Sequence, residues 1–320
     1  MKTLGNSGLR VSEVSFGCMS LGSDHAANSQ LLHAAVDAGI NFFDTADLYA
    51  RGENEVMVGN AFKDRRDKVI IATKVGNQLR KDGSGWDWNP TRAYILQAVE
   101  QSLRRLQTDY IDLYQLHGGT IEDPIDETIS AFEELKKQGK IRAYGISSIR
   151  PNVIREYVKR SSIASVMMQY SLLDRRPEET CFELLSQHDV SVLTRGSLAS
   201  GMLVDKAAKD YLGYSVGEVE RARLSIKDAA EYEYRTRNTE YRISKGNAIN
   251  ANTKEDGFKA VQVALRFALH APVVASAVTG VRTPEQLRQA VETMQMPALS
   301  SEAMASLRQV LPANKYESHR

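Results

Sequence analysis

The sequence predicts an α/β protein built as a single (β/α)8 barrel, also called a TIM barrel. Short apolar runs alternate with helical patterns along the chain, and together they make eight strand-then-helix units. Strands that alternate with helices indicate a parallel sheet, and eight such units suffice to close the sheet into a barrel. A doubly wound open sheet is the rival fold, but no G-x-G-x-x-G motif follows the first strand of the series.

The chain length is compatible with this fold. A chain of 320 residues would give roughly two average domains, yet single barrels commonly reach about 250 residues or more. We therefore expect one domain over residues 1–320.

The first half of the chain begins with a predicted hairpin. Gly5-Asn6-Ser7-Gly8 lies between short apolar pieces, which is typical of the turn of an N-terminal β-hairpin. Gly39 ends the next helical pattern, and an unbroken apolar run after Val69 is typical of a buried parallel strand. In chain order, we expect strand 14–17, helix 31–38, strands 41–44 and 69–74, helix 91–106, strand 111–116 and helix 125–138.

The second half repeats the same alternation. Gly139 ends one helix, and Pro151 stands where proline is favoured, at the start of the next. In chain order, we expect strand 141–146, helix 151–158, strand 166–169, helix 177–188, strand 190–194, helix 258–270, strand 273–278 and helices 284–294 and 301–310.

One stretch, residues 204–256, interrupts the alternation after the seventh strand. It holds ten basic and ten acidic residues, five of the thirteen tyrosines and no convincing strand. Connections this long are usually functional or disordered. In a barrel it would hang over the active-site face, so we interpret it as a lid or cofactor clamp.

Charge and composition exclude several classes of function. The chain has 41 basic and 40 acidic residues, which argues against a broad nucleic-acid-binding surface. Its two cysteines, Cys18 and Cys181, do not indicate a disulfide framework. The N-terminus lacks the apolar run of a signal peptide, and no stretch approaches the roughly 20 apolar residues of a membrane span. We therefore expect a cytoplasmic protein with neither a membrane nor a nucleic-acid partner.

Four polar side chains follow consecutive predicted strands. Asp44, Lys74 and His117 come at the ends of the second, third and fourth strands, and Tyr49 lies in the loop after the second. Barrel enzymes place their catalytic groups at these strand ends. A phenol with a pKa near 10 is a weak acid at neutral pH, but a nearby Lys74 ammonium would favour the phenolate and lower that pKa. Tyr49 could then donate a proton to a carbonyl oxygen that His117 orients, with Asp44 keeping Lys74 charged.

Each of these residues also has an ordinary structural interpretation. An aspartate after a strand is usually a helix cap or loop residue, and a lysine there is usually solvated. A loop tyrosine is usually packing, and a single histidine is usually a satisfied polar group. The catalytic interpretation depends on the four occurring together.

Several longer motifs resemble the aldo-keto reductase family, in particular a bacterial branch of uncharacterised or stress-associated reductases. Asn41 to Tyr49 is similar to the family signature, and Gly52 to Glu55 with Val58-Gly59 continues it. Ile71 to Gly76, Asp109 to His117 and Gly139 to Ser147 are similar to the family's third, fourth and fifth strands. The resemblance runs from the N-terminal hairpin to the last helix and is weakest over 204–256.

This resemblance implies the barrel fold and reversible, NADPH-dependent reduction of an aldehyde or ketone to an alcohol. It implies that Tyr49 is the general acid and base, that Lys74 and Asp44 tune it, and that His117 orients the carbonyl. The family uses no metal, and the chain has neither H-E-x-x-H nor C-x-x-C spacing.

The resemblance also implies a set of NADPH-binding residues at the later strand ends. Ser148 stands where the family commonly has asparagine, and Ala290 replaces a common asparagine near the adenine. Arg195 has a planar guanidinium that can stack on the nicotinamide, although it could equally be a salt-bridge partner at the barrel rim. Arg282 beside a helix N-terminus suits the 2′-phosphate and favours NADPH over NADH. The implied cofactor residues are Ser147, Ser148, Gln169, Arg195, Gly196, Ser197, Leu198, Gly201, Gly280, Arg282 and Gln286.

Two further functions are compatible with the sequence. The chain could be an NADP(H)-binding regulatory or sensor subunit with little turnover, as some members of the family are channel-associated subunits. Lys74 could instead form a Schiff base with a carbonyl substrate, which the neighbouring Asp44, Tyr49 and His117 make the weakest alternative. The pattern of residues leaves the physiological substrate and the oligomeric state open.

Overall fold

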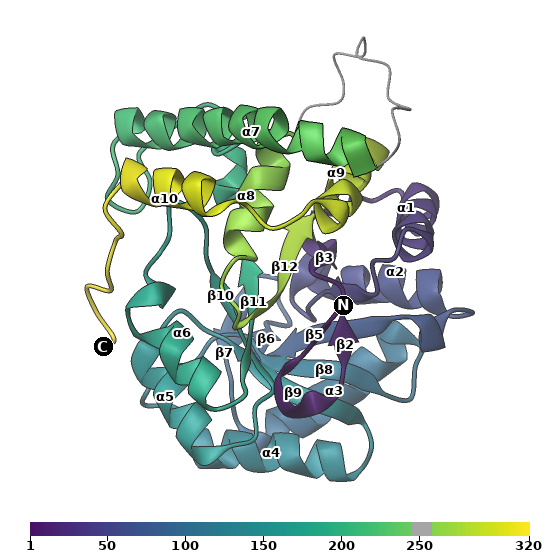
Figure 1. Ribbon diagram of the computed structural model, residues 1–320. Coiled ribbons are helices and arrows are strands. Elements are labelled where there is room, and N and C mark those ends of the chain that lie inside the picture. The colour runs from purple at the N-terminus through teal and green to yellow at the C-terminus, as the bar shows by residue number, and fades with distance from the viewer. Residues whose placement is uncertain (245–257) are drawn as a thin grey trace.

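A computed structural model shows the closed parallel barrel that the alternation predicts (Figure 1). The structure describes residues 1–244 and 258–320, with the side chains of 1–236 and 258–320. Neighbouring strands around the barrel follow the order β10-β11-β12-β3-β4-β5-β8-β9. The strands are β3 (Val14–Gly17), β4 (Phe42–Asp44), β5 (Ile70–Val75), β8 (Ile111–Leu116), β9 (Ile141–Ser147), β10 (Ser165–Gln169), β11 (Ser191–Arg195) and β12 (Val274–Gly280).

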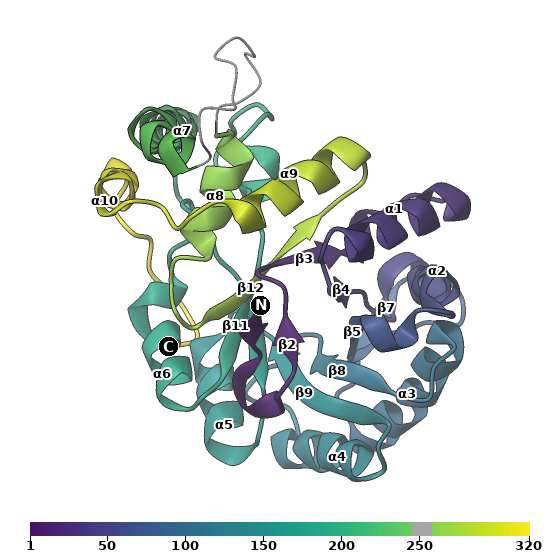
Figure 2. The same cartoon turned by 45° about the vertical axis from the view of Figure 1, so that its right-hand side comes forward.

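Helices form the outer layer around these strands (Figure 2). Thr91 and Thr283 cap the helices that follow them, since the side-chain oxygen of each accepts a backbone N–H. Proline stands in the first turn of the second of these helices and of two others. The helices are α1 (His25–Asp37), α2 (Glu53–Phe62), α3 (Arg92–Leu106), α4 (Ile125–Lys137), α5 (Pro151–Arg160), α6 (Pro177–Gln187), α7 (Val216–Ser244), α8 (Ala260–Ala268), α9 (Pro284–Gln295) and α10 (Ser301–Val310).

The predicted N-terminal hairpin closes one end of the barrel. It consists of β1 (Lys2–Thr3) and β2 (Arg10–Val11), which pair antiparallel. Leu4 and Val11 are fully buried and join the apolar cluster that fills the barrel interior. The Lys2 ammonium donates to the Val274 carbonyl at 2.8 Å, at the beginning of β12. The hairpin therefore lies at the N-terminal ends of the strands and leaves the opposite end open.

Helix α2 follows the second barrel strand and was absent from the expected elements. Its buried positions include the polar residues Asn54 and Glu55, so it lacks the apolar stripe that identifies an amphipathic helix. Gly59 lies where α2 crosses α3, and a Cβ there would stand 2.5 Å from the Arg105 carbonyl oxygen. Close packing of two backbones, rather than helix propensity, explains this element.

A small antiparallel hairpin also departs from the expectation of a plain loop. Strands β6 (Asn77–Leu79) and β7 (Trp86–Trp88) pair beyond the end of β5. The Trp88 ring packs over Gly76, where a Cβ would come within 2.6 Å of it, and its indole N–H donates to Asp123 at 2.9 Å. The hairpin is thereby fixed beside the open end of the barrel.

The insertion after β11 contains a long helix, α7, which the sequence pattern did not predict. In Figure 1 α7 lies across the outer side of α8 and α10. Val219, Ala222, Ile226 and Ala230 form its buried face and pack in an apolar cluster with residues of those two helices. Residues 245–256 of the predicted insertion lie outside the described residues. In the described parts of the chain, no helix combines the length and apolar character needed to cross a membrane.

Candidate active site

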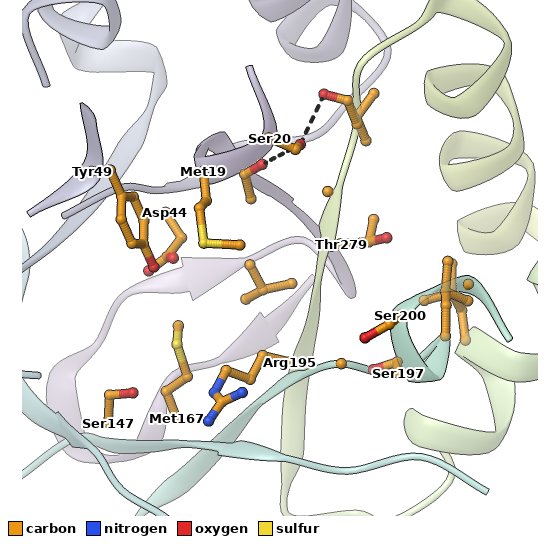
Figure 3. A pocket seen from close by; sticks show the side chains of 18 of the residues that line it. Met19, Ser20, Asp44, Tyr49, Ser147, Met167, Arg195, Ser197, Ser200 and Thr279 are labelled. Atoms are coloured by element: carbon orange, nitrogen blue, oxygen red, sulfur yellow. Dashed lines mark hydrogen bonds between the residues drawn. The ribbon is translucent and has the colours of Figure 1, made fainter. Parts of the chain in front are cut away.

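The open end of the barrel holds a cavity of about 1520 Å³. Asp44, Ser147, Arg195 and Gly280 line it, and each is the last residue of its strand. Figure 3 shows Tyr49 and Asp44 on one side of this space, with Ser147, Met167 and Arg195 facing them. The strand ends therefore bring side chains from distant parts of the sequence to one pocket, as expected for a barrel enzyme.

Strand alternation directs three of the four predicted catalytic residues inward. Ile70 and Ala72 of β5 belong to the interior cluster, and Lys74 is the next residue on the same side. Asp44 follows the interior residue Phe42 in the same way. His117 comes four residues after the interior residue Leu113, with Gln115 between them on that side. The period of two thus places Asp44, Lys74 and His117 at the barrel mouth.

Lys74 is the centre of the catalytic group. It is 1% exposed, and its ammonium donates to Asp44 at 2.6 Å, to the Thr45 carbonyl at 2.7 Å and to the Tyr49 hydroxyl at 3.3 Å. An ammonium has three N–H donors, so all three are used. The side-chain amide of Gln115 donates to the other Asp44 oxygen at 3.5 Å, a supporting contact that the sequence did not single out.

Tyr49 reaches this group from a strained turn. Ala50 and Arg51, the two residues after it, have φ of 47° and 56°, in the left-handed region that is unfavourable for residues with a Cβ. The Arg51 guanidinium donates to the carbonyls of Arg80 and Gly83 at 3.3 and 3.5 Å, at the tip of the β6–β7 hairpin. These contacts help to hold the turn, and with it Tyr49, in place.

The pKa of Tyr49 differs from the expectation. Burial raises it above the ordinary value, and Lys74, which lowers it, offsets only part of that effect. Lys74 does lower the pKa of Tyr49, as expected, but the desolvation of the phenolate outweighs this effect and the pKa is raised overall.

The pKa of Lys74 itself is raised, since Asp44 and Tyr49 favour its charged form against the effect of burial. A Schiff-base lysine must lose its proton to attack a carbonyl, which requires the opposite shift. This disfavours the Schiff-base alternative. Burial also raises the pKa of Asp44, and Lys74 opposes that shift, but the 2.6 Å contact is that of a charge-assisted hydrogen bond.

His117 lies edge-on to Tyr49, with 5.9 Å between the ring centres. Burial, followed by the charges of Lys74 and Arg195, lowers its pKa to about 3, so the imidazole is neutral at pH 7. Its Nδ1 atom is buried and has no hydrogen-bond partner among the described residues. A neutral imidazole next to Tyr49 can donate one hydrogen bond to a ligand oxygen, and it does not compete with that oxygen for the Tyr49 proton.

The predicted cofactor residues mostly share the same cavity. All of them line it except Gln169, which stands behind Arg195 and accepts a hydrogen bond from its guanidinium at 3.2 Å. The Gln169 amide also donates to the Tyr211 hydroxyl at 2.5 Å, in the insertion. Arg195 forms no ion pair with a carboxylate in the described parts of the chain, where its guanidinium donates to Gln169 instead.

The segment after β11 has a backbone suited to an anion. Gly196, Ala199, Ser200 and Gly201 all have positive φ, between 46° and 93°. Successive residues of this kind form concave backbone surfaces that present N–H groups to anions. Ser197 is buried and Gly201 lies on the cavity wall, so this concavity opens toward the proposed cofactor space.

The far end of the cavity lies at the start of α9. Thr283 caps this helix, and the Arg282 backbone N–H donates to the Gln286 side chain at 2.8 Å. The Arg282 guanidinium is exposed and has no ion-pair partner among the described residues. The positive end of a helix beside a guanidinium that has no ion pair in the described chain suits a phosphate. The cavity thus has the size and the donors that a dinucleotide such as NADPH needs.

Several cavity residues were not among the predicted site residues. Met19, Trp86 and Ile149 are exposed apolar side chains at the mouth. Lys206, near the start of the insertion, and Lys259, the N-cap of α8, are basic residues of the cavity. Neither lysine gives a sequence signal of its own, because only the fold brings them to the cavity.

Comparisons with known proteins identify the family of the chain. A model of the Aldo/keto reductase family matches residues 13–312. The chain is 45% identical to an uncharacterized oxidoreductase, YqkF, of Bacillus subtilis (strain 168), over 100% of this chain and 99% of that protein. It is 28% identical to a probable voltage-gated potassium channel subunit beta of Oryza sativa subsp. japonica, over 100% and 99% of the two chains. Among solved structures, the holo form of aldo-keto reductase AKR11C1 from Bacillus halodurans has a TM-score of 0.87 at 46% identity, covering 100% and 98% of the two chains. The chain belongs to the aldo/keto reductase family of oxidoreductases.

Proposed function

We propose that this protein is an NADPH-dependent reductase that converts an aldehyde or ketone into an alcohol, with Tyr49 as the general acid. The observation that carries the proposal is the contact between the Tyr49 hydroxyl and the fully engaged ammonium of Lys74. The Lys74 ammonium donates to the hydroxyl oxygen, so Lys74 is the group that stabilises negative charge on that oxygen once the phenol has given up its proton.

The raised pKa of Tyr49 is consistent with this role. A phenol that keeps its proton at pH 7 is available as an acid, and the adjacent ammonium stabilises the phenolate left after proton transfer. Asp44 keeps Lys74 positively charged throughout, because the pKa of Lys74 is raised by this carboxylate.

His117 and the cavity mouth support binding of a carbonyl. The neutral imidazole can hold the carbonyl oxygen near the Tyr49 hydroxyl, and the exposed apolar side chains at the mouth exclude water from the reacting carbon. When bound, NADPH would supply the hydride that reaches that carbon. Ser147, Ser148 and Arg195 would hold its nicotinamide end, with Gln169 supporting Arg195 from behind. Gly196 to Gly201 would hold its middle, and Gly280, Arg282 and Gln286 its adenosine end.

The test is Tyr49→Phe, which keeps the ring and removes the hydroxyl. We expect kcat for carbonyl reduction to fall by roughly 10² to 10⁴, while the Kd for NADPH, measured by quenching of protein fluorescence, stays the same. Tyr232→Phe, on the exposed side of α7, is the matched control. Unchanged turnover in Tyr49→Phe would refute the mechanism.

The likeness to a probable channel subunit favours a second candidate, a cofactor-binding regulatory subunit. A screen of carbonyl substrates that follows NADPH absorbance separates the two. Tight NADPH binding with no turnover across aliphatic, aromatic and dicarbonyl compounds would favour the regulatory function over the enzyme.

A further inference from the structure

The adenosine end of the cavity has two walls, and only one of them was predicted from the sequence. The first wall is the β12–α9 turn with Arg282. The second is the beginning of α8, where Lys259, Ala260 and Val261 line the same cavity as Arg282 and Glu285. Lys259 comes immediately after the long insertion, so its position opposite α9 depends on how the chain returns to the barrel.

Two backbone anchors fix Lys259 at this place. It is the N-cap residue of α8, and its N–H donates to the Gln262 side chain at 2.8 Å. Gln262 in turn donates to Glu292 of α9 at 3.1 Å, and α8 packs against α9. The Lys259 backbone is therefore held relative to the helix whose N-terminus forms the predicted phosphate site.

Within the described residues, the side chain of Lys259 has one ionic partner, and that partner also accepts hydrogen bonds from other side chains. Its ammonium lies 3.3 Å from Glu285. Glu285 accepts shorter contacts from Arg288, at 2.8 and 2.9 Å, and from Gln289, at 2.7 Å. Hydrogen bonds from Arg288 and Gln289 lower the pKa of Glu285 to about 2, so it stays ionised with or without Lys259.

The local charge balance leaves room for an anion. Among the described side chains, Lys259, Arg282 and Arg288 supply three positive charges and Glu285 and Glu292 supply two negative ones, so these five groups carry one positive charge in excess. Arg288 is paired with both carboxylates. The cations available to a ligand are therefore Arg282, which is unpaired within the described residues, and Lys259, whose contact with Glu285 is the longest of the group.

We infer that Lys259 is a second cationic ligand of the cofactor's 2′-phosphate, which exchanges its contact with Glu285 for one with the phosphate and faces Arg282 across it. This inference rests on the proposed use of NADPH. It makes Lys259, at the start of α8, a residue that determines specificity between NADPH and NADH.

The test measures binding rather than turnover. Fluorescence titration would give the Kd for NADPH and for NADH of the wild type, Lys259→Gln, Lys259→Arg and Lys209→Gln. Lys209 is an exposed insertion lysine away from the cavity and controls for the loss of one charge. We expect Lys259→Gln to weaken NADPH binding about tenfold, as for a lost charge-assisted contact, and to leave NADH binding unchanged. Lys259→Arg should retain NADPH affinity within about twofold, because it keeps the charge.

Two small ligands measure the contribution of the 2′-phosphate by itself. Adenosine 2′,5′-bisphosphate and AMP differ only in the 2′-phosphate, and calorimetry with both should show the same selective loss in Lys259→Gln. If Lys259→Gln behaves like Lys209→Gln while Arg282→Gln loses NADPH selectively, this inference is wrong and the proposed NADPH dependence stands. If the wild type binds NADPH and NADH equally, the proposed cofactor preference itself is wrong.

Discussion

At the scale of single residues, Lys74 contributes both to the stability of the barrel and to the proposed acid catalysis. Its ammonium is buried and donates to Asp44, to the Thr45 carbonyl and to Tyr49. Removing one partner of a buried ion pair leaves the other charge without compensation, which is costly. The same side chain that supports the proposed acid thus also neutralises an aspartate inside the fold.

Lys74→Met should therefore lower both activity and stability. We expect the free energy of unfolding to fall by about 3–5 kcal/mol because Asp44 is left buried and unpaired. Chemical denaturation measures this loss. The double variant Asp44→Asn/Lys74→Met should recover part of the stability but none of the activity, and equal stability of the single and double variants would contradict the argument.

The pH dependence of the enzyme should reflect the neutral state of His117. Because its pKa is lowered to about 3, kcat/KM should show no acid limb near pH 6.5, the ordinary value for histidine. The unfolded chain takes up a proton there and the folded chain does not, so the fold loses stability as the pH falls from about 6.5 toward 3. The free energy of unfolding of His117→Gln should fall less than that of the wild type between pH 6.5 and about pH 3. A kcat/KM limb with a pKa near 6.5 that vanishes in His117→Gln would contradict this prediction.

The four catalytic candidates could be predicted from the sequence because strand ends converge in any barrel, whatever its loops. Their electrostatic properties could not. The raised pKa of Tyr49 depends on how deeply the ring is buried, which the turn at Ala50 and Arg51 sets. Lys259 was missed for a related reason, since its approach to Glu285 is set by how α8 packs on α9.

At the scale of elements, most strands and helices were predictable because their apolar periodicity is strong. The expected strand 141–146 and the observed β9 (Ile141–Ser147), for example, differ by one residue. Helix α2 was missed because it buries Asn54 and Glu55 and touches α3 through a glycine. Helix α7 was missed because charged residues surround the narrow apolar face that it packs on α8 and α10.

Gly59 should be required for the contact between α2 and α3. In Gly59→Ala, the new Cβ would lie 2.5 Å from the Arg105 carbonyl oxygen and 2.6 Å from the Leu106 carbonyl carbon, so a backbone must move. We expect a loss of about 1–3 kcal/mol in the free energy of unfolding, measured in urea. Gly217→Ala near the start of α7, where a Cβ meets nothing within 4 Å, should cause no loss.

The insertion also reaches the proposed nicotinamide end through Tyr211. Its hydroxyl accepts a hydrogen bond from the side-chain amide N–H of Gln169, and the carbonyl oxygen of that amide then faces Arg195. In Tyr211→Phe this amide is free to rotate, and we expect cofactor affinity to fall by about 2- to 10-fold, the value of one hydrogen bond. Fluorescence titration should show equal losses for NADPH and NADH, in contrast to Lys259→Gln. A loss confined to NADPH would contradict the assignment of Gln169 to the nicotinamide end.

At the scale of the whole molecule, the protein contains a second apolar cluster outside the barrel wall. Helix α7 contributes Val219, Ala222 and Ile226 to it, and α10 contributes Met304 and Leu307. Its formation explains why part of the insertion is an ordered helix although the stretch as a whole is charge-neutral and rich in polar residues. The packing also fixes the two chain segments that enter the cavity at Lys206 and Lys259.

Ile226→Ala should test the contribution of this cluster. Ile226 is fully buried, so we expect the free energy of unfolding to fall by about 2–5 kcal/mol. Leu224→Ala, on the same helix but 48% exposed, should change it by no more than about 0.5 kcal/mol. Thermal and urea unfolding measure both, and equal effects of the two substitutions would show that α7 contributes no packing energy.

The N-terminal hairpin imposes an order of events during synthesis. Lys2 contacts the Val274 carbonyl, 272 residues later, and the Gly5 N–H donates to Ser191, 186 residues later. At roughly 5–20 residues per second on the ribosome, Val274 is synthesised about 14–54 s after Lys2. Until then Leu4 and Val11 have no barrel interior to enter, and β3 has no β12 beside it. The nascent chain therefore exposes an unfinished apolar sheet edge for most of its translation, which makes this the period when it most needs protection from aggregation.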